Sequence, residues 1–213
     1  MKVEWLGHAC FLITAANGTR IITDPYAVDD RIRFAPVNAA AEVVLVSHGH
    51  FDHGNVAAVQ GNPQVIKEAG QHQAAGMEFR GVAAFHDMSE GKQRGTNVLF
   101  SFPVDGLRLC HLGDLGHTLS PQQVKDLGSV DVLFIPVGGT YTVDASQANE
   151  VCNQLKPRVV IPMHFKNPKV GLPIAGVEDF LAKRSPVSHV KGSTVELLPG
   201  KLSAETIVLE PAR

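Results

Sequence analysis

The chain has 213 residues, a length at which a single domain buries a substantial core, and we expect residues 1–213 to form one domain. A hydrophobic fraction of 44% excludes a disordered chain, and no apolar run approaches the roughly 18 residues of a membrane span. The formal net charge of −2 without a basic run argues against nucleic acid as a partner, although a small phosphorylated substrate would need only one or two cations.

The cysteines and the first residues of the chain bear on its cellular compartment. Cys10, Cys110 and Cys152 lie among apolar neighbours and are expected to be buried free thiols of a reducing compartment. The chain begins with a strand-like segment and shows no secretory signal. We therefore expect a cytoplasmic protein without a membrane partner.

Short strands are predicted first along the chain, at Lys2 to Leu6, Cys10 to Thr14 and Arg20 to Thr23, with Asn17-Gly18 as a hairpin turn. Four later runs are short and apolar on both faces, as in strands covered by layers on both sides. These runs are Val43 to Val46, Leu107 to Cys110, Val132 to Ile135 and Val159 to Ile161.

Polar residues follow three of these four buried strands. The runs lead into His48, Asp114 and His164, and the fourth leads into a loop that contains Gly138-Gly139. Buried strands that deliver ligand-type side chains to loops at one sheet edge form a rigid platform for a site. The pattern predicts an active-site rim.

Helices are predicted between the later strands. Ser120-Pro121-Gln122-Gln123 has the residues of a capping box with proline at the first helical position. Asp144 can cap a second helix, and a third is predicted from about Val177 to Lys183. The tail reads as strand at Thr194 to Leu197 and Thr206 to Glu210. Strands followed by strand–helix alternation predict a layered α/β or α+β domain.

The segment HGHFDH, from His48 to His53, carries the chemical argument. Imidazole and carboxylate are ligands of borderline divalent metals. His48 and His50 project to one side of an extended segment, while Asp52 and His53 can face a neighbouring position. Without a metal, four ionisable groups beside a buried strand would be costly. The segment therefore predicts two adjacent metal ions.

Two adjacent ions need more ligands than this segment supplies. We assign His48, His50 and His86 to the first metal, Asp52, His53 and His164 to the second, and Asp114 to a bridging position. The expected chemistry uses a metal-bridged hydroxide, with Asp52 and Asp114 as the catalytic carboxylates. Zinc is the first expectation for both ions, and manganese and iron are alternatives because the same ligands suit them.

The HGHFDH segment resembles the H-x-H-x-D-H signature of the metallo-β-lactamase superfamily, and His86, Asp114 and His164 follow in that superfamily's order. The resemblance implies an α+β fold, a four-layer αββα sandwich, with Asp24 supporting the ligand loop from behind. The compact chain looks like the UPF0173-type or ascorbate-6-phosphate-lactonase-like branch. The cues are Gly7-His8, the stretch from His111 to His117, and Pro136 to Thr140.

Several roles stay open at this stage. His111 competes with His86 as third ligand of the first metal, and His86 is preferred because an apolar run precedes it and a polar loop follows. His8 and His111 are otherwise expected to support the ligands. Arg94, Asn97 and Tyr141 are candidates for substrate binding, although ordinary turns would also explain them.

The leading function is hydrolysis of a small-molecule ester, lactone, amide, thioester or phosphodiester. The first alternative is a nuclease-like phosphodiesterase, which a basic groove or an added binding domain would favour. The second is a metal-binding sensor or scaffold without turnover, against which the full ligand set argues. No oligomeric state is predicted.

Overall fold

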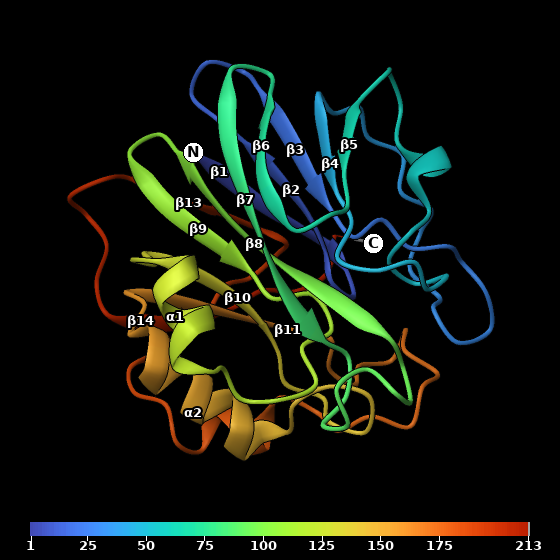
Figure 1. Cartoon of the computed structure of the whole chain (residues 1–213), viewed down its shortest axis with the longest axis vertical. Coiled ribbons are helices and arrows are strands. Elements are labelled where there is room, and N and C mark those ends of the chain that lie inside the picture. The colour runs from blue at the N-terminus through green and yellow to red at the C-terminus, as the bar shows by residue number, and fades with distance from the viewer. Residues whose placement is uncertain (213) are drawn as a thin grey trace.

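Two β-sheets that face each other form the centre of the computed structural model, which describes residues 1–212 (Figure 1). The six-stranded sheet has the order β13-β1-β2-β3-β4-β5 and the eight-stranded sheet has the order β12-β14-β11-β10-β9-β8-β7-β6. The strands are β1 (Lys2–Gly7), β2 (Cys10–Thr14), β3 (Arg20–Thr23), β4 (Val43–Leu45), β5 (Gln64–Ile66), β6 (Gly70–Ala74), β7 (Met77–Phe85), β8 (Thr96–Val104), β9 (Leu107–His111), β10 (Val132–Pro136), β11 (Val159–Met163), β12 (Val187–His189), β13 (Thr194–Glu196) and β14 (Glu205–Val208).

The core between the sheets is aliphatic and aromatic. Trp5 and Phe11 from the six-stranded sheet and Phe100 and Phe134 from the eight-stranded sheet belong to one buried cluster. The rings of Phe11 and Phe134 lie 4.5 Å apart between centroids. Burial of such side chains from both sheets supplies the main driving force for the sandwich.

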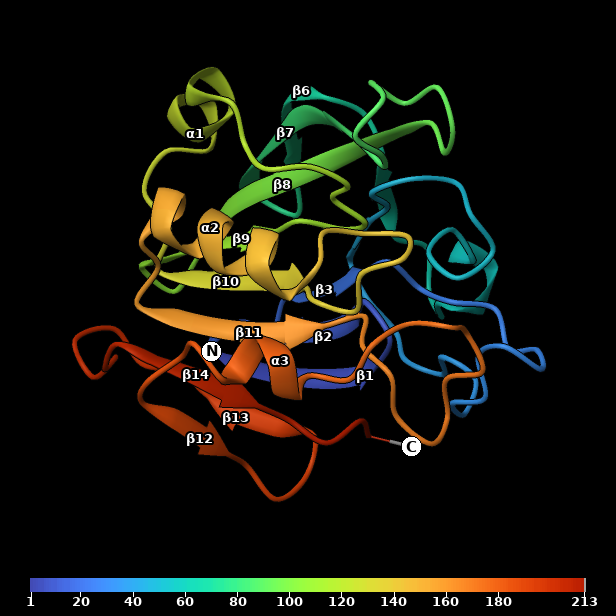
Figure 2. The same cartoon turned by 90° about the horizontal axis from the view of Figure 1, so that it is seen from below.

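Three helices cover the outer face of the eight-stranded sheet: α1 (Pro121–Leu127), α2 (Ala145–Leu155) and α3 (Glu178–Leu181) (Figure 2). The predicted capping box at Ser120 and the predicted cap at Asp144 are confirmed, with Ser120 and Asp144 accepting from the backbone amides of Gln123 and Gln147. Gln147 completes a second capping box, which was not predicted. The third helix is shorter than the predicted range from Val177 to Lys183. No helix in residues 1–212 is long and apolar enough to cross a bilayer.

The outer face of the six-stranded sheet is covered differently. Ile22 and Val44 pack there against Tyr26 and Phe34 from the long loop after β3, and against Leu172. The 3-10 helix η1 (Val56–Ala58) lies in the same layer. The predicted α+β sandwich is confirmed, and its layer on this side consists of loops and one short 3-10 helix.

All strands predicted from the first part of the chain and from the four apolar runs are confirmed to within two residues. Of the antiparallel meander β6-β7-β8, the sequence indicates only the end of β7, through the apolar run Val82 to Phe85 that precedes His86. β6 is mostly exposed and polar, and β8 contains Ser101 and Pro103, so neither shows a clean apolar pattern.

Strand direction explains how distant segments meet. β1, β3 and β4 run the same way within one sheet, and β7, β9, β10 and β11 run the same way within the other. Their carboxyl ends therefore lie at one edge of each sheet. Six polar residues directly follow these ends or lie within three residues of them: His8, Asp24, His48, His86, Asp114 and His164.

Candidate metal centre

The segment from His48 to His53 forms a tight turn after β4. The backbone amides of His53 and Gly54 both donate to the carbonyl oxygen of His50, at 3.1 and 2.9 Å. The rings of His48 and His50 lie edge to face, 4.6 Å apart, on the extended part of the segment. Asp52 and His53 then face the next position, as the alternation of side chains in the sequence indicated.

The first group of ligand-type atoms belongs to His48, His50 and His86, which lie within 4.8 Å of one another. His86 Nδ1 donates to the carbonyl oxygen of Tyr141 at 3.1 Å, so Nε2 keeps its lone pair for a cation. The competing candidate, His111, instead places its Nε2 atom 2.7 Å from Asp24. The structure thus brings His86, rather than His111, to His48 and His50.

The second group contains Asp52, His53 and His164, together with His8, again within 4.8 Å. His8 Nε2 lies 3.1 Å from Asp52 Oδ2, and the rings of His8 and His164 are 4.1 Å apart. His8 therefore touches one predicted ligand through a hydrogen bond and another through ring packing. The supporting role expected for His8 from the sequence stays a prediction, which these two contacts favour.

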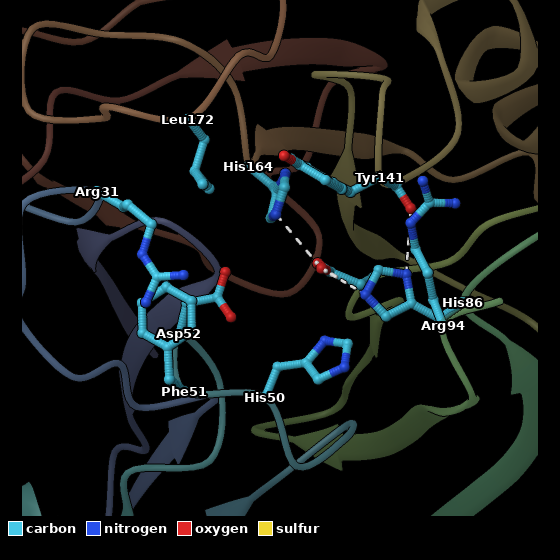
Figure 3. Close-up of a pocket in the computed structure, with 10 residues that line it drawn as sticks. Arg31, His50, Phe51, Asp52, His86, Arg94, Tyr141, His164 and Leu172 are labelled. Atoms are coloured by element: carbon cyan, nitrogen blue, oxygen red, sulfur yellow. Dashed lines mark hydrogen bonds and ion pairs between the residues drawn. The ribbon is translucent and has the colours of Figure 1, made fainter.

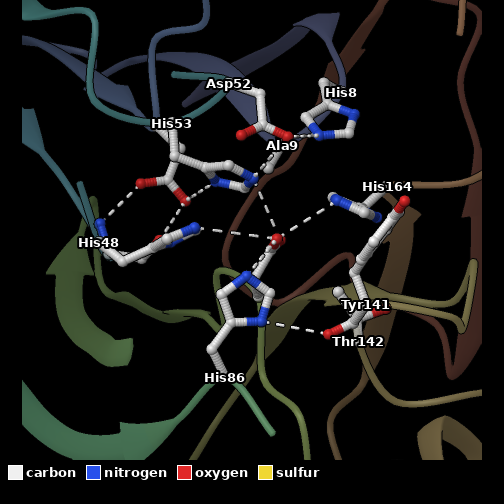
Figure 4. Close-up of polar contacts among 12 residues, drawn as sticks. His8, Ala9, His48, Asp52, His53, His86, Tyr141, Thr142 and His164 are labelled. Atoms are coloured by element: carbon white, nitrogen blue, oxygen red, sulfur yellow. Dashed lines mark hydrogen bonds and ion pairs between the residues drawn. The ribbon is translucent and has the colours of Figure 1, made fainter. Parts of the chain in front are cut away.

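Asp114 lies between the two groups. Figure 4 shows the imidazoles of His53, His86 and His164 directed at the same part of the centre. The Oδ1 atom of Asp114 is 3.1 Å from His53 Nε2. Its Oδ2 atom is 3.2 Å from His86 Nε2 and 3.3 Å from His164 Nε2. One carboxylate thus faces imidazoles of both groups, which is the position that the bridging assignment requires.

Several polar atoms of the centre test whether these residues suit a metal. Within residues 1–212, His48 Nε2 is buried without a hydrogen-bond partner, and His53 Nε2 and Asp114 Oδ1, 3.1 Å apart, have no hydrogen-bond partner other than each other. Buried polar atoms are rarely left unpaired, because each costs on the order of 1–3 kcal/mol. Lone pairs of imidazole and carboxylate that face one another are satisfied by divalent cations. The donor set therefore fits metal binding.

Asp24 holds the centre from behind. Its carboxylate accepts hydrogen bonds from the amide and hydroxyl of Ser47, at 2.7 and 2.8 Å, and from the rings of His53 and His111. The Ser47 hydroxyl also lies 3.0 Å from His48 Nδ1. Both His48 and His53 are thereby fixed through Nδ1, which leaves Nε2 directed at the centre. Ser47 is a supporting residue that the sequence did not reveal.

Burial and charged neighbours shift the pKa values of several residues in the centre. Burial would raise the pKa of Asp114, but the imidazoles of His164 and His53 outweigh it and hold that pKa well below its usual range. Burial would lower the pKa of His53, yet the surrounding carboxylates raise it well above the ordinary value. Burial and the neighbouring His53 lower the pKa of His48 to about 3. In the absence of a cation, a proton on His53 therefore balances part of the negative charge.

Backbone strain is concentrated here. His8, Asp24 and His164 have left-handed backbone angles, with φ of 53°, 38° and 51°. Such conformations are uncommon for residues other than glycine and cost of order 1–3 kcal/mol each. The loops also approach closely, because a Cβ on Gly113 would lie 2.3 Å from the Ser47 side chain. The surrounding structure thus enforces the positions of three polar residues, as is typical of functional sites.

A cavity of about 350 Å³ opens above the centre (Figure 3). Among the predicted substrate-binding residues, Arg94 and Tyr141 line it. Three further lining residues had no signal in the sequence: Arg31, Phe51 and Leu172. Arg31 and Leu172 come from loops that only tertiary packing brings to this edge, whereas Phe51 lies within the HGHFDH segment.

Asn97 does not line the cavity, which corrects its assignment as a substrate-binding candidate. It lies in β8, fully buried, rather than in the loop. Its Nδ2 atom donates to the Leu112 carbonyl oxygen at 2.9 Å, and its Oδ1 atom accepts from the Asp114 amide at 3.0 Å. Asn97 therefore positions the Asp114 loop.

Comparison with known proteins agrees with this geometry. Residues 2–164 match the family described as the Beta-lactamase superfamily domain. A UPF0173 metal-dependent hydrolase of Pelotomaculum thermopropionicum is 30% identical over 194 residues, covering 78% of this chain and 84% of the relative. A UPF0173 protein of Pyrococcus furiosus is 31% identical over 188 residues, covering 78% and 83%.

A solved structure from Thermotoga maritima, assigned as a Zn-dependent hydrolase of the metallo-β-lactamase superfamily, is 37% identical. It covers 98% of this chain and 99% of its own, with a TM-score of 0.81. The fold and the His/Asp cluster are those of a metal-dependent hydrolase. The chain belongs to the metallo-β-lactamase superfamily, and its homologues include UPF0173 metal-dependent hydrolases.

Proposed function

We propose that the protein is a binuclear metal-dependent hydrolase of a small-molecule substrate. The observation that supports this most directly is the position of Asp114 between two groups of ligand-type atoms. His48, His50 and His86 would hold one cation, and Asp52, His53 and His164 the other. Zinc is the first candidate, because nitrogen and carboxylate ligands suit it and the Thermotoga maritima relative is assigned as Zn-dependent.

The cations, when bound, would supply Lewis acidity that activates a water and polarises the bond to be cleaved. The protein's own part is orientation and proton transfer. His8 holds Asp52 through Oδ2, while Asp52 lines the cavity and is placed to accept a proton there. Asp24 keeps the Nδ1 proton on His53, so that Nε2 remains a lone-pair donor.

The cavity favours a small substrate over a polymer. Its volume of about 350 Å³ is near the lower end of the roughly 300–1,000 Å³ typical of small-molecule sites. Nuclease activity would need an extended basic surface in addition to the two arginines of this cavity. The net charge of −2 argues against such a surface. A metal sensor without turnover is disfavoured by the open cavity over the centre.

The experiment combines metal analysis with a panel of ester, lactone, thioester and phosphodiester substrates. We expect close to two transition-metal ions per chain, identified by elemental analysis, and hydrolysis of at least one class. Asp52→Ala and His164→Ala should each remove one metal and abolish that activity, because each loses a ligand of the second cation. His189→Ala, at an exposed residue of β12, is the matched control. A folded protein that refuses zinc, manganese and iron contradicts the proposal.

A further inference from the structure

Two arginines enter the cavity from different sides. Arg31 comes from the loop after β3 and lies beside Asp52, whereas Arg94 comes from the loop between β7 and β8 and lies beside His86 (Figure 3). Each guanidinium group lies near an aromatic ring. The Cζ atom of Arg31 is 3.7 Å from the ring centroid of Phe51, and that of Arg94 is 5.5 Å from the ring centroid of Tyr141.

The two arginines differ in how their charge is balanced. The guanidinium of Arg31 donates to Asp29 Oδ2 through two nitrogens, at 2.6 and 2.9 Å. Within residues 1–212, the guanidinium of Arg94 forms no ion pair and no hydrogen bond to a side chain. Arg94 is therefore the arginine of the cavity whose charge is available to a ligand.

The backbone of Arg94 is held by Asp87. The Asp87 carboxylate accepts four backbone hydrogen bonds, from Ser89, Gly91, Gln93 and Arg94, at 2.7 to 3.0 Å. These hydrogen bonds hold the loop from Ser89 to Arg94 against Asp87, the residue that follows His86. The loop thus presents Arg94 from a fixed backbone, which reduces the entropy lost when the side chain binds a ligand.

The rest of the cavity suits the uncharged part of a small molecule. Phe51, Tyr141 and Leu172 form apolar walls between the arginines and the His/Asp cluster. Specific recognition in such a cavity depends on a few placed polar groups, and a guanidinium binds carboxylate and phosphate oxygens in a bidentate manner.

We infer that the substrate carries an anionic group, a carboxylate or a phosphate, which binds Arg94 while the hydrolysed bond lies over the His/Asp cluster. Arg31 contributes less to this recognition, because Asp29 already neutralises it. That the bound molecule is hydrolysed rests on the proposed hydrolase function. That its anionic group is bound rests on Arg94 alone.

The test uses three nitrophenyl esters of similar length whose acyl chains end in a methyl group, a carboxylate or a phosphate. Wild type should prefer at least one charged ester over the neutral one, and the more favoured charged ester identifies the anionic group. Arg94→Gln should lower the ratio of kcat/KM for the charged ester to kcat/KM for the neutral ester by about tenfold or more. Arg94→Lys should restore part of the preference, and Arg31→Gln should have the smaller effect.

Arg108→Gln is the matched control, since Arg108 is exposed on β9 and does not line the cavity. A second readout does not depend on turnover: calorimetric binding of succinate and of inorganic phosphate to the protein as purified. Arg94→Gln should weaken binding of one of them by about tenfold, and Arg108→Gln should not.

The outcomes separate the two proposals. Equal hydrolysis of neutral and charged esters by wild type and Arg94→Gln overturns the anionic substrate and leaves the hydrolase intact. Binding of succinate and phosphate that is unchanged in Arg94→Gln overturns it as well. Arg94-dependent anion binding without hydrolysis of any substrate class supports the anion site and counts against the hydrolase.

Discussion

His53 and Asp24 form a buried hydrogen bond of 3.0 Å between residues that are 29 positions apart in the chain. The bond occupies Nδ1 of the ring, so the opposite nitrogen, Nε2, faces Asp114 at 3.1 Å. Asp24 also accepts from His111, and these two imidazoles hold its pKa well below the usual range despite complete burial. The ligand geometry of the centre therefore depends on a carboxylate that does not itself face the cavity.

Replacing Asp24 by asparagine should weaken metal binding. The amide keeps the shape of the side chain but removes the charge that fixes the ring of His53, and loss of such supporting groups costs about 10–100-fold in metal affinity. Competition with a chromophoric zinc chelator would measure the change. Asp126→Asn, at a partly exposed ion pair with Arg80, is the control. Unchanged zinc affinity in Asp24→Asn would show that the hydrogen bond does not orient a ligand.

The metal-free protein should be most stable near about pH 6.5. Burial lowers the pKa of His8 to about 4 and that of His48 to about 3. The unfolded chain therefore binds more protons than the native state below the ordinary histidine pKa of about 6.5, and stability falls as pH falls. The raised pKa of His53 has the opposite effect on stability. Above about pH 6.5 the native state binds this proton more strongly than the unfolded chain does, so the stability that His53 contributes falls as pH rises.

Urea unfolding of chelator-treated protein across pH would measure this dependence. Zinc-loaded protein should lack the alkaline decline, since bound metal displaces the proton from His53. His189→Ala should leave the profile unchanged, because that residue is exposed on β12. Stability of the metal-free protein that keeps rising above about pH 6.5 would contradict the assigned charge of His53.

Removing the Asp87 carboxylate should loosen the loop that carries Arg94. Asp87→Ala leaves four backbone amides without their acceptor, and three of the four belong to residues between Ser89 and Gln93. Metal content should stay near that of wild type, because His86 keeps its own hydrogen bonds to Gly95 and Tyr141. Binding of succinate or phosphate should weaken about as much as in Arg94→Gln.

Calorimetry and elemental analysis of the same preparation would separate the two effects. Loss of metal in Asp87→Ala would assign the residue to the metal centre rather than to the anion-binding loop. Asp126→Ala tests whether removal of another carboxylate that accepts hydrogen bonds has the same effect.

The sequence was most informative where local signals are strong. The caps at Ser120 and Asp144 predicted where two helices begin, because a side chain and a backbone amide three residues apart interact within one turn. The HGHFDH segment indicated a metal centre, since so many ionisable groups after a buried strand need a shared partner.

Tertiary structure decided what depends on contacts between distant segments. The sequence left His86 and His111 as competing ligands, and only the pairing of β7, β8 and β9 turns His86 to the cluster and His111 to Asp24. Asn97 and Arg94 stand three residues apart, yet one is buried beneath the Asp114 loop and the other lines the cavity. Strand direction and sheet packing decide which distant side chains come within a few ångströms of one another. The residues next to each side chain in the sequence do not determine these contacts, because the contacts join segments far apart in the chain.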